Sequence, residues 1–206
     1  MKNKFLLFQG KPVVYSVRDT FTTAKIFGLR IAEPTGQYLI SDGAGAASIS
    51  NGKLVYNNNS ALAGGLYTSL LSRVAGRALF VSTLNRTTIP SLSAGFGTGV
   101  PPSNGAYDIG LDYNGTTTIR IKTGVGVIDS VAVNASNQHD FCFVMRNTGG
   151  FIFMRDGTSG VYKLIWVYNS TTSSEYAKVF TGAGNINYQL DNFKLGDIGG
   201  SFTTDN

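Results

Sequence analysis

The side chains that could carry out acid–base chemistry are few in this sequence, and most of them stand alone. Glycoside hydrolysis generally needs two carboxylates about 5–5.5 Å or 6.5–9.5 Å apart beside the scissile bond. The only glutamates, Glu33 and Glu175, fall separately in expected loops. Asp108 and Asp112 are four residues apart, so in a strand they point to the same face. That spacing fits an active-site pair, and it also fits solvated residues on an exposed sheet face.

Nucleophilic chemistry and metal chemistry based on cysteine have even less support. His139 is the only histidine, and no G-x-S-x-G nucleophile motif accompanies it. Cys142 is the only cysteine, which excludes an internal disulfide and a cysteine-built zinc site, and its neighbours Phe141 and Phe143 predict a buried, inert thiol. The glycine-rich run at 95–99 lacks the lysine of a phosphate-binding loop. We therefore expect a protein that is not an enzyme.

The positive charge of the chain is concentrated in its first segment. The formal net charge is +5, and residues 1–30, with six Lys or Arg and one Asp, account for all of it. A nucleic-acid-binding domain usually carries a basic face built from its own fold. Because the body of the chain is neutral, we expect no nucleic acid among its partners.

The composition and periodicity of the chain predict an all-β protein. Charged residues make up 14% of the chain, against about 25% in an average domain. Alternation of apolar and polar residues recurs along the sequence, whereas helical periodicity is nearly absent. Three hairpins are expected, around Asn51-Gly52, around Asn114-Gly115, and between residues 141 and 155 with residues 147–150 as the turn.

The remaining segments complete this picture of short strands joined by turns. Residues 78–81 and 162–168 are apolar without alternation, which fits central strands covered on both faces. Residues 62–74 have leucines at helical spacing, but Gly64 and Gly65 leave a strand equally open. Residues 94–105 are expected to form one long loop. A dozen or more strands without helix alternation predict one domain, a sandwich of antiparallel sheets.

Several segments, taken in order, match the pattern of one fold family. The first two segments are Arg18-Asp19-Thr20-Phe21, which resembles a D-x-F opening, and Pro34-Thr35-Gly36-Gln37. The hairpin at 49–54 follows, and residues 144–153 resemble an RSTGAF hairpin. The last two segments are the strand at 164–168 and the closing strand Leu190-Asp191-Asn192-Phe193-Lys194-Leu195. Together they resemble the concanavalin A-like (laminin-G-like) jelly-roll domains found in bacteriophage structural and tail proteins. The resemblance implies an antiparallel β-sandwich, the concanavalin A-like jelly roll, over residues 18–196. Residues 1–17 are then a leading segment and residues 197–206 a polar tail.

The resemblance implies a fold that hosts many functions, so the residues must separate them. The hydrolases of this fold carry an E-x-D-x-x-E pattern on one strand, and the sequence has none. We therefore expect a non-enzymatic bacteriophage virion structural protein, a capsid-surface, tail or baseplate component. It would act through contacts with other virion proteins or copies of itself. The alternative is a carbohydrate-binding, lectin-like module that attaches to host-surface glycans, with calcium as a candidate cofactor.

The resemblance also points to residues that could bind an ion or a glycan. Concanavalin A-like modules often bind calcium near their paired first and last strands, where Asp19 and Asp191 fall. Hard oxygen ligands suit that ion, but the same aspartates could instead cap or bridge strand ends. Exposed aromatic residues can stack on sugars, and the candidates are Tyr107, Tyr113 and Tyr176, although core packing explains most aromatic residues of such strands.

The leading segment is more apolar than a free tail, with Phe5, Leu6, Leu7 and Phe8 as contact candidates. It could be an extra strand on the domain's own edge, or an arm that adds a strand to a neighbouring subunit. Its apolar run is shorter than the ~7–15 residues of a signal-peptide core, and no stretch approaches the ~20 apolar residues of a membrane span. We therefore expect a protein made in the host cytoplasm without a signal peptide, located in the virion and not inserted in a membrane.

Overall fold

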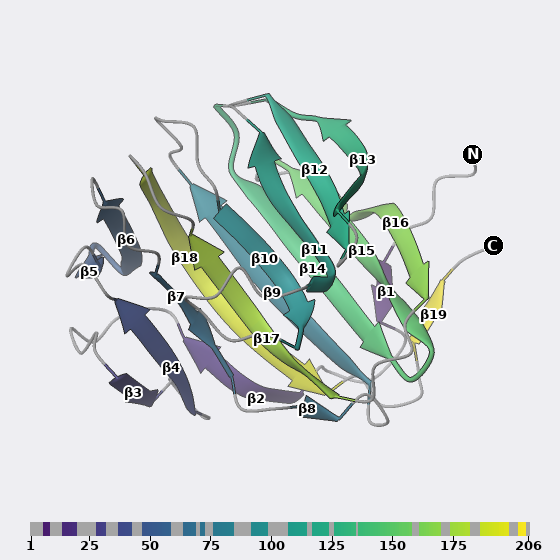
Figure 1. Ribbon diagram of the computed structural model, residues 1–206, viewed down its shortest axis with the longest axis horizontal. Coiled ribbons are helices and arrows are strands. Elements are labelled where there is room, and N and C mark those ends of the chain that lie inside the picture. The colour runs from purple at the N-terminus through teal and green to yellow at the C-terminus, as the bar shows by residue number, and fades with distance from the viewer. Residues whose placement is uncertain are drawn as a thin grey trace.

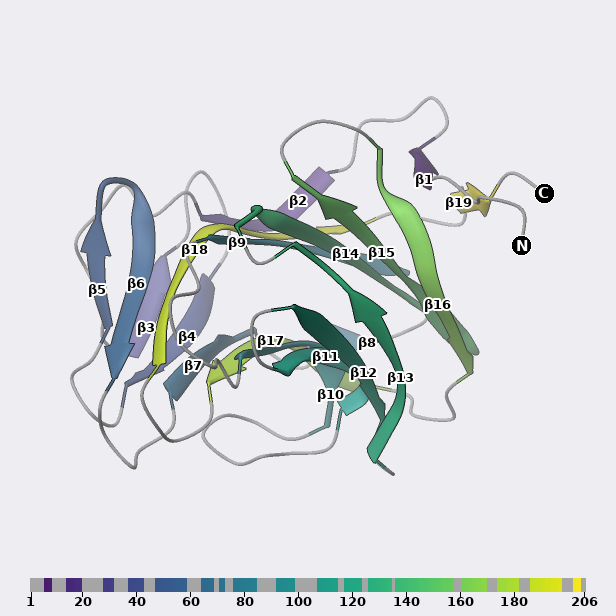
Figure 2. The ribbon, with the colours of Figure 1, turned by 90° about the horizontal axis from the view of Figure 1, so that it is seen from above.

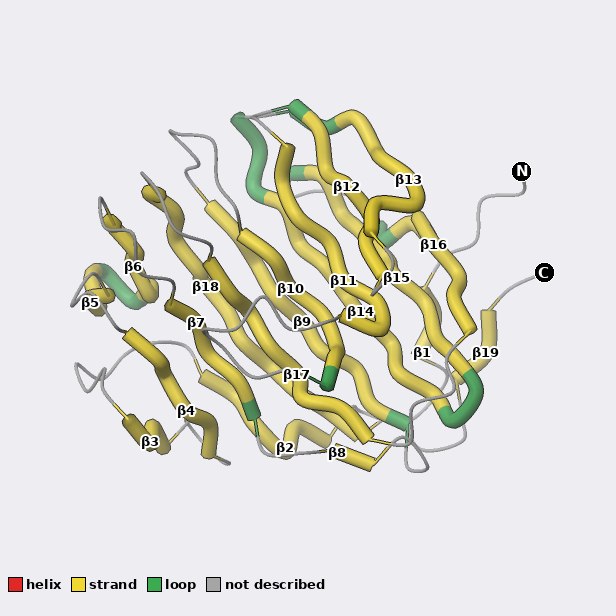
Figure 3. The backbone as a smooth tube through the Cα atoms, in the orientation of Figure 1, coloured by secondary structure: helices red, strands yellow, loops and turns green. Residues whose placement is uncertain are grey.

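Strands account for nearly all of the structure, a computed structural model of the 206-residue chain (Figure 3). None of the described residues forms a helix, so none belongs to an apolar helix of the length that crosses a membrane. The structure describes residues 6–8, 14–19, 28–31, 37–42, 47–58, 64–68, 71–72, 76–84, 92–98, 107–114, 117–123, 126–134, 136–157, 161–169, 174–181, 186–197 and 202–204.

The described strands are short, as the alternating sequence predicts. In chain order they are β1 (Leu6–Phe8), β2 (Val14–Asp19), β3 (Gly28–Ile31), β4 (Gln37–Asp42), β5 (Ala47–Ser50), β6 (Lys53–Asn58), β7 (Gly64–Tyr67), β8 (Leu71–Ser72), β9 (Arg77–Leu84), β10 (Leu92–Gly97), β11 (Tyr107–Asn114), β12 (Thr118–Thr123), β13 (Gly126–Ala132), β14 (His139–Arg146), β15 (Gly149–Asp156), β16 (Lys163–Asn169), β17 (Ser174–Thr181), β18 (Ile186–Asp197) and β19 (Phe202–Thr204).

Two antiparallel sheets form the layers of a sandwich, and we name each after one of its central strands. The β9 sheet has the order β16-β15-β14-β9-β18-β6-β5, with β2 also paired to β18. The β10 sheet has the order β13-β12-β11-β10-β17-β7-β4-β3, with β8 also paired to β17. Figures 1 and 2 show β13 and β16 at one side of the sandwich and β3 and β5 at the other. This arrangement confirms the predicted all-β, antiparallel sandwich.

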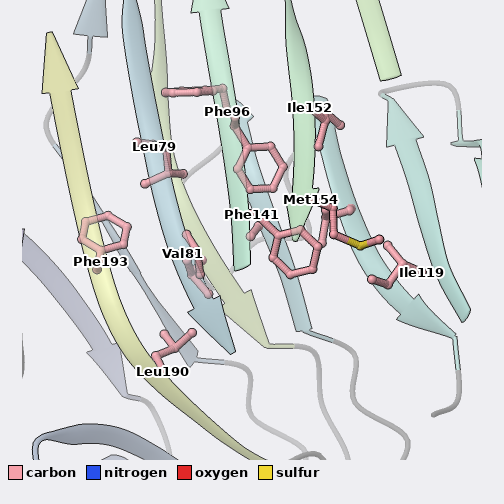
Figure 4. Close-up of a cluster of buried hydrophobic side chains, with 14 of the residues drawn as sticks. Leu79, Val81, Phe96, Ile119, Phe141, Ile152, Met154, Leu190 and Phe193 are labelled. Carbon is pink, nitrogen blue, oxygen red and sulfur yellow. The ribbon is translucent and has the colours of Figure 1, made fainter. Parts of the chain in front are cut away.

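Alternate residues of the two sheets meet in one hydrophobic core. Phe96 of β10 comes from one layer, and Leu79, Phe141 and Phe193 of β9, β14 and β18 come from the other. These side chains are fully buried, and Figure 4 shows them gathered between the sheets. Burial of each such side chain contributes about 1.5–3 kcal/mol, so the sheets stay together through this shared interior.

The three predicted hairpins form, but their turns differ from one another. Asn51 and Gly52 have φ angles of 51° and 68°, which confirms the expected turn with positive φ at both central residues. In the second hairpin Asn114 pairs with Thr118, so the loop between the strands is longer than the predicted two-residue turn. In the third, Arg146 pairs with Gly149, and the turn is reduced to two residues.

One segment that was expected to be a loop is partly in a strand, and a second, for which helix and strand were both open, is observed as strands. The prediction of one loop over 94–105 is wrong for residues 94–97, which belong to β10 because Ala94 and Phe96 point into the core. Gly95, between them, has a φ of 146° and pairs with both β11 and β17. Within residues 62–74 the described parts are the strands β7 and β8, so of the two alternatives the strand is observed.

The apolar run at 162–168 was predicted to be a central strand, and this is wrong. β16 is the last strand of the β9 sheet, and Val167 is 53% exposed. The apolar residues of β16 have different environments, because Trp166 packs against the main core and Leu164 against a smaller cluster on the opposite face of the sheet. An unbroken apolar run therefore does not require neighbours on both sides of the strand.

The terminal segments lie partly outside the sandwich. β2 pairs with β18 of the chain's own sheet, with Val17 opposite Leu195, so the sandwich begins before the predicted boundary at residue 18. β1 pairs with β19 in a separate two-stranded sheet, with Phe8 opposite Phe202, and a strand thus lies within the predicted polar tail. Both views show this small sheet beside β16 (Figures 1 and 2).

Gly150, near the turn of the third hairpin, has no space for a side chain. A Cβ atom added there would overlap the carbonyl oxygen of Val144 and the ring of Tyr168. We expect Gly150→Ala to lower the free energy of unfolding by about 1–3 kcal/mol, since overpacking forces the backbone to shift. Urea denaturation measures the change. Thr148→Ala in the exposed turn is the control, expected within about 0.5 kcal/mol of wild type, and equal midpoints for the two variants would contradict the packing described.

Candidate functional site

A polar cluster lies at one end of the sandwich, where the chain passes from β13 to β14 and where β15 ends. β14 and β15 pair in register with His139 opposite Asp156, which brings the loop before β14 beside the end of β15. The backbone amide of Asn137 donates a hydrogen bond to the carbonyl oxygen of Asn134 at 3.1 Å. The backbone amide of Gly157 donates one to the carbonyl oxygen of Gln138 at 2.8 Å. We call Asn134, Asn137, His139 and Asp156 the Asp156 cluster.

His139 is fully buried at the centre of this cluster, and both of its ring nitrogens have partners. Nδ1 lies 3.0 Å from the hydroxyl oxygen of Tyr113, and Nε2 lies 3.0 Å from the carbonyl oxygen of Asn134 and 3.3 Å from Oδ1 of Asp156. Because Nε2 faces two acceptors, it carries the ring proton of the neutral imidazole. Nδ1 then accepts a hydrogen bond from the hydroxyl group of Tyr113. The imidazole also stacks on the Tyr113 ring, with centroids 5.8 Å apart.

Tyr113, His139 and Asp156 contact one another in sequence, as the nucleophile, base and orienting carboxylate of a catalytic triad do. A substrate cannot reach these groups, however. Tyr113 is 1% exposed and His139 is 0% exposed. A catalytic nucleophile must lie within reach of the reacting atom, which buried groups in a packed interior do not. The role of Tyr113 and His139 is therefore structural, because they fix the start of β14 and hold the carboxylate of Asp156 in one orientation.

Asp156 is the charged and accessible member of the cluster, with a side chain that is 34% exposed. Its Oδ1 accepts a hydrogen bond from Nδ2 of Asn137 at 2.7 Å, and its Oδ2 accepts one from the backbone amide of Asn134 at 3.4 Å. Burial acts to raise the pKa of Asp156, but these two bonds, together with the electrostatic attraction and the hydrogen bond of His139, lower it below the ordinary value of 3.8. The carboxylate is thus both ionised and oriented.

The solvent side of the cluster presents several hydrogen-bonding groups together. Asn134 and Ser136 are exposed, and Asn137 and Gln138 are half-buried. The side-chain oxygen of Asn134 accepts a bond from the backbone amide of Ser136 at 3.0 Å, which orders the loop. A fixed carboxylate beside amide groups can accept hydrogen bonds from the hydroxyl groups of a ligand with little loss of conformational freedom. The arrangement is therefore suited to bind a polyhydroxylated ligand.

A buried ion pair on the outer face of the β9 sheet adjoins this cluster. Asp140 is 1% exposed, and its carboxylate accepts bonds from the guanidinium of Arg155 and from Nε2 of Gln138 at 2.8 Å. The bond to Asp140 raises the pKa of Arg155, which remains charged. The guanidinium carbon lies 5.4 Å from the ring centroid of Tyr162, and that ring meets Phe80 edge-on at 6.5 Å. The pair thus anchors the aromatic side chains of this face.

Cys142 belongs to a small apolar cluster to which these aromatic residues are packed. The thiol is fully buried, and burial raises its pKa well above the ordinary value of 9.0. A protonated, buried thiol is a poor nucleophile and a poor metal ligand. The prediction of a buried, inert thiol is therefore confirmed.

An aromatic pair lies on the outer face of the β10 sheet. The rings of Tyr67 and Tyr176 meet edge to face with centroids 6.1 Å apart, and both residues are half-buried. The backbone amide of Thr68 donates to the carbonyl oxygen of Ala177 at 3.0 Å, and the amide of Ala177 donates to Oγ1 of Thr68 at 3.2 Å. Lys178, opposite Tyr67 in the strand register, is only 1% exposed. Of the predicted glycan contacts, Tyr176 thus lies outside the core beside a second ring.

The other predicted contact residues are placed differently. The prediction of Tyr113 as a glycan contact is wrong, because this residue lies in the core. Leu111 and Tyr113 are alternate residues of β11, and both side chains face the interior. Tyr107 begins β11, and its side chain lies outside the described part of the structure. Phe5 lies outside the described residues, and Leu6, Leu7 and Phe8 form β1.

The carboxylates that the sequence singled out do not form one site in the described structure. Asp112 of β11 pairs with Arg120 of β12, and Asp108 lies two pleats away in the same strand. The prediction of a loop at Glu175 is wrong, because Glu175 lies in β17 and pairs with Leu71 of β8. Glu33 lies outside the described residues.

The two aspartates predicted to bind calcium come close to one another in the strand register. Asp19 ends β2 opposite Phe193, and Asp191 lies in β18 where the pairing with β9 is irregular. Among the described residues there is no group of three or more His, Cys, Asp or Glu that could hold a metal ion. Calcium binding by Asp19 and Asp191 therefore stays a prediction.

Comparison with solved structures places this sandwich among lectin folds. The exoplasmic/lumenal domain of VIP36, in its form with Ca²⁺ and Man3GlcNAc bound, has a TM-score of 0.58 at 9% identity, over 78% of this chain and 83% of that one. The metal-free carbohydrate recognition domain of Emp46p has a TM-score of 0.54 at 9% identity, over 78% and 88%. Lectin I-B4 from Griffonia simplicifolia, also metal-free, has a TM-score of 0.55 at 8% identity, over 82% and 93%.

These similarities show the fold, a concanavalin A-like β-sandwich, and they confirm the predicted fold class. Neither a scan against protein-family models nor a search of curated proteins found a match. The similarity covers most of the chain, so the lectin-like architecture applies to the sandwich as a whole.

The hydrogen bonds to Asp156 make the stability of the protein depend on pH. Because the pKa of Asp156 is lower in the folded chain than its ordinary 3.8, its carboxylate stabilises the fold above that pH, and this contribution is lost as the pH falls through the folded-state pKa. We expect Asn137→Ala to raise the pKa of Asp156 toward 3.8, since a donor to the ionised form is removed. An NMR titration of the carboxyl carbon measures both values. Ser136→Ala is the control and should leave the pKa of Asp156 unchanged, whereas no change in Asn137→Ala would contradict the assigned role of its amide.

Proposed function

We propose that this protein is a carbohydrate-binding module and that the solvent side of the Asp156 cluster contacts the sugar. The observation that carries the proposal is the Asp156 carboxylate, which is 34% exposed yet held by donors from Asn137 and Asn134. The likeness to the VIP36 domain solved with Man3GlcNAc, and with mannose, supports a glycan as the ligand. The exposed amide and hydroxyl groups of the loop supply further partners for sugar hydroxyls.

Binding at this site would rely on hydrogen bonds to a preformed array. The carboxylate of Asp156 can accept hydrogen bonds from sugar hydroxyls, while Asn137 and His139 keep it in place. Each such hydrogen bond contributes about 0.5–1.5 kcal/mol net, so one site alone binds weakly. Several copies acting together raise the overall affinity through avidity.

A glycan array followed by calorimetry with the best ligand tests the proposal on the full chain. We expect Asp156→Asn to weaken binding about tenfold or more, because the neutral amide has one acceptor oxygen in place of two and gives no charge assistance. Ser48→Ala is the control: this side chain is also exposed, but it lies on β5 at the opposite side of the sandwich, outside the cluster.

Three results would contradict the proposal or part of it. Wild-type affinity in Asp156→Asn would remove the site, and no signal from the wild-type protein on the array, with calcium present, would remove the function. Chelation of calcium in the same assay tests Asp19 and Asp191, since binding that is unchanged without calcium would contradict a required ion at these residues.

A second candidate function is that of a structural component of a bacteriophage virion, in which the protein contacts other virion proteins or copies of itself. The observation that favours it is the small β1–β19 sheet, which keeps Leu6–Phe8 apart from both sheets of the sandwich. Deletion of residues 1–13 spares β2, which begins at Val14. We expect this deletion to abolish incorporation into particles, measured by mass spectrometry of purified virions, and normal incorporation would contradict a docking role for the segment.

A further inference from the structure

The exposed large hydrophobic side chains of the described residues all lie at one side of the sandwich. On β13, Val127 is 50% exposed and Ile128 is 39% exposed. Val167 of β16 is 53% exposed, and Val161, just before β16, is 55% exposed. β13 and β16 are the last strands of their sheets on the same side of the molecule (Figures 1 and 2). The four residues therefore belong to one region, which we call the β13–β16 side.

Single exposed apolar residues are common on protein surfaces, but four on two adjacent sheet edges are not explained by chance exposure. An edge strand already exposes backbone groups that can pair with another chain, and proteins usually place charged residues there to prevent this. Here each of the two edges carries an exposed charge of opposite sign, Asp129 on β13 and Lys163 on β16. No ion pair of either residue is found among the described residues.

At Ser130 the β13 edge is not free to pair with another strand. Oδ1 of Asp129 accepts a hydrogen bond from the backbone amide of Ser130 at 2.7 Å, so that amide already has a partner. The exposed side chains that can form a contact at this edge are those of Val127, Ile128 and Asp129. On β16 the corresponding groups are Val161, Val167 and Lys163.

We propose that the β13–β16 side binds a second copy of this chain, with β13 of each copy against β16 of the other around a two-fold axis. The charges favour this occupant and this arrangement. If the same edge of both copies met, Asp129 would lie against Asp129, or Lys163 against Lys163. In the proposed arrangement Asp129 of each copy lies near Lys163 of the other, so the two-fold axis gives two such pairs of opposite charge. The exposed valines and isoleucine then pack at the centre of each contact, where water is excluded.

This dimer does not depend on the proposed sugar site. The Asp156 cluster is formed by the loop before β14 and the end of β15, and none of its four residues is among those that make the contact. The two proposals can therefore fail separately. If both hold, each dimer presents two sugar sites, which supplies the avidity that a weak single site requires.

Sedimentation equilibrium of the full chain across a wide concentration range tests the dimer. We expect Val127→Glu and Val167→Glu each to raise the dimer dissociation constant about tenfold or more. Asp129→Lys and Lys163→Asp should each weaken the dimer as well, and the two reversals combined in one chain should restore most of the wild-type affinity. Lys53→Asp on β6, at the opposite side of the sandwich, is the matched control and should leave the dissociation constant unchanged.

The outcomes separate the possible arrangements. A wild-type protein that stays monomeric at all concentrations overturns the proposal. The proposal is also overturned if the single charge reversals do not weaken the dimer, or if the combined reversals do not restore it. Either result would mean that the interface lies elsewhere or that the same edge of both copies meets. The substituted side chains of β13 and β16 are exposed and that of Lys53 is half-buried, and near-ultraviolet circular dichroism checks that each variant keeps the fold.

Discussion

The burial of β14 on both of its faces is the constraint on which the rest of this structure depends. Phe141, Phe143 and Met145 face the core between the sheets, and Cys142 and Val144 face a second apolar cluster on the outer side. A strand with one apolar face has its register set by the side that must be buried. β14 has two apolar faces, so a shift by one residue is not penalised in that way. Its ends must therefore set its register.

Both ends of β14 carry features that do so. At its start, His139 is bonded to Tyr113 and to Asn134, and Asp140 is bonded to Arg155 of β15, so a shifted strand would leave a buried ring and a buried charge without partners. At its end, the turn reduces the choice of pairing to Arg146 opposite Gly149. The polar groups near the start of β14 thus stabilise the apolar strand, and the apolar strand in turn positions the polar groups.

The candidate site depends on this mutual arrangement. Asp156 is opposite His139 because the hairpin has one register, and its carboxylate is oriented because the histidine is packed against Tyr113 and cannot turn. A site built on strand ends has less freedom than a site built on long loops, which favours weak but selective hydrogen bonding. β13 leads directly into the loop of the site, so a contact that orders β13 also restrains Asn134 and Ser136.

Local chemistry was enough to predict some features of this protein, whereas other features depend on which strands lie side by side in the fold. Asn51-Gly52 specified its turn, alternation specified strands, and the apolar surroundings of Cys142 specified a buried thiol, because each follows from a few adjacent residues. The apolar run at 162–168 could not show that β16 is an edge strand, since exposure depends on which strands pair beside it.

The sequence missed Asp156, Asn134 and Asn137 of the candidate site, and it wrongly offered Tyr113, which lies in the core, while Tyr176 lies on the outer face of the other sheet. The missing information was the length of one turn. With a four-residue turn at 147–150 the hairpin register differs, and only the two-residue turn places His139 opposite Asp156. In that register Gly149 and Gly150 pass closely beside Tyr168 of β16, a contact between distant parts of the chain that no local pattern records.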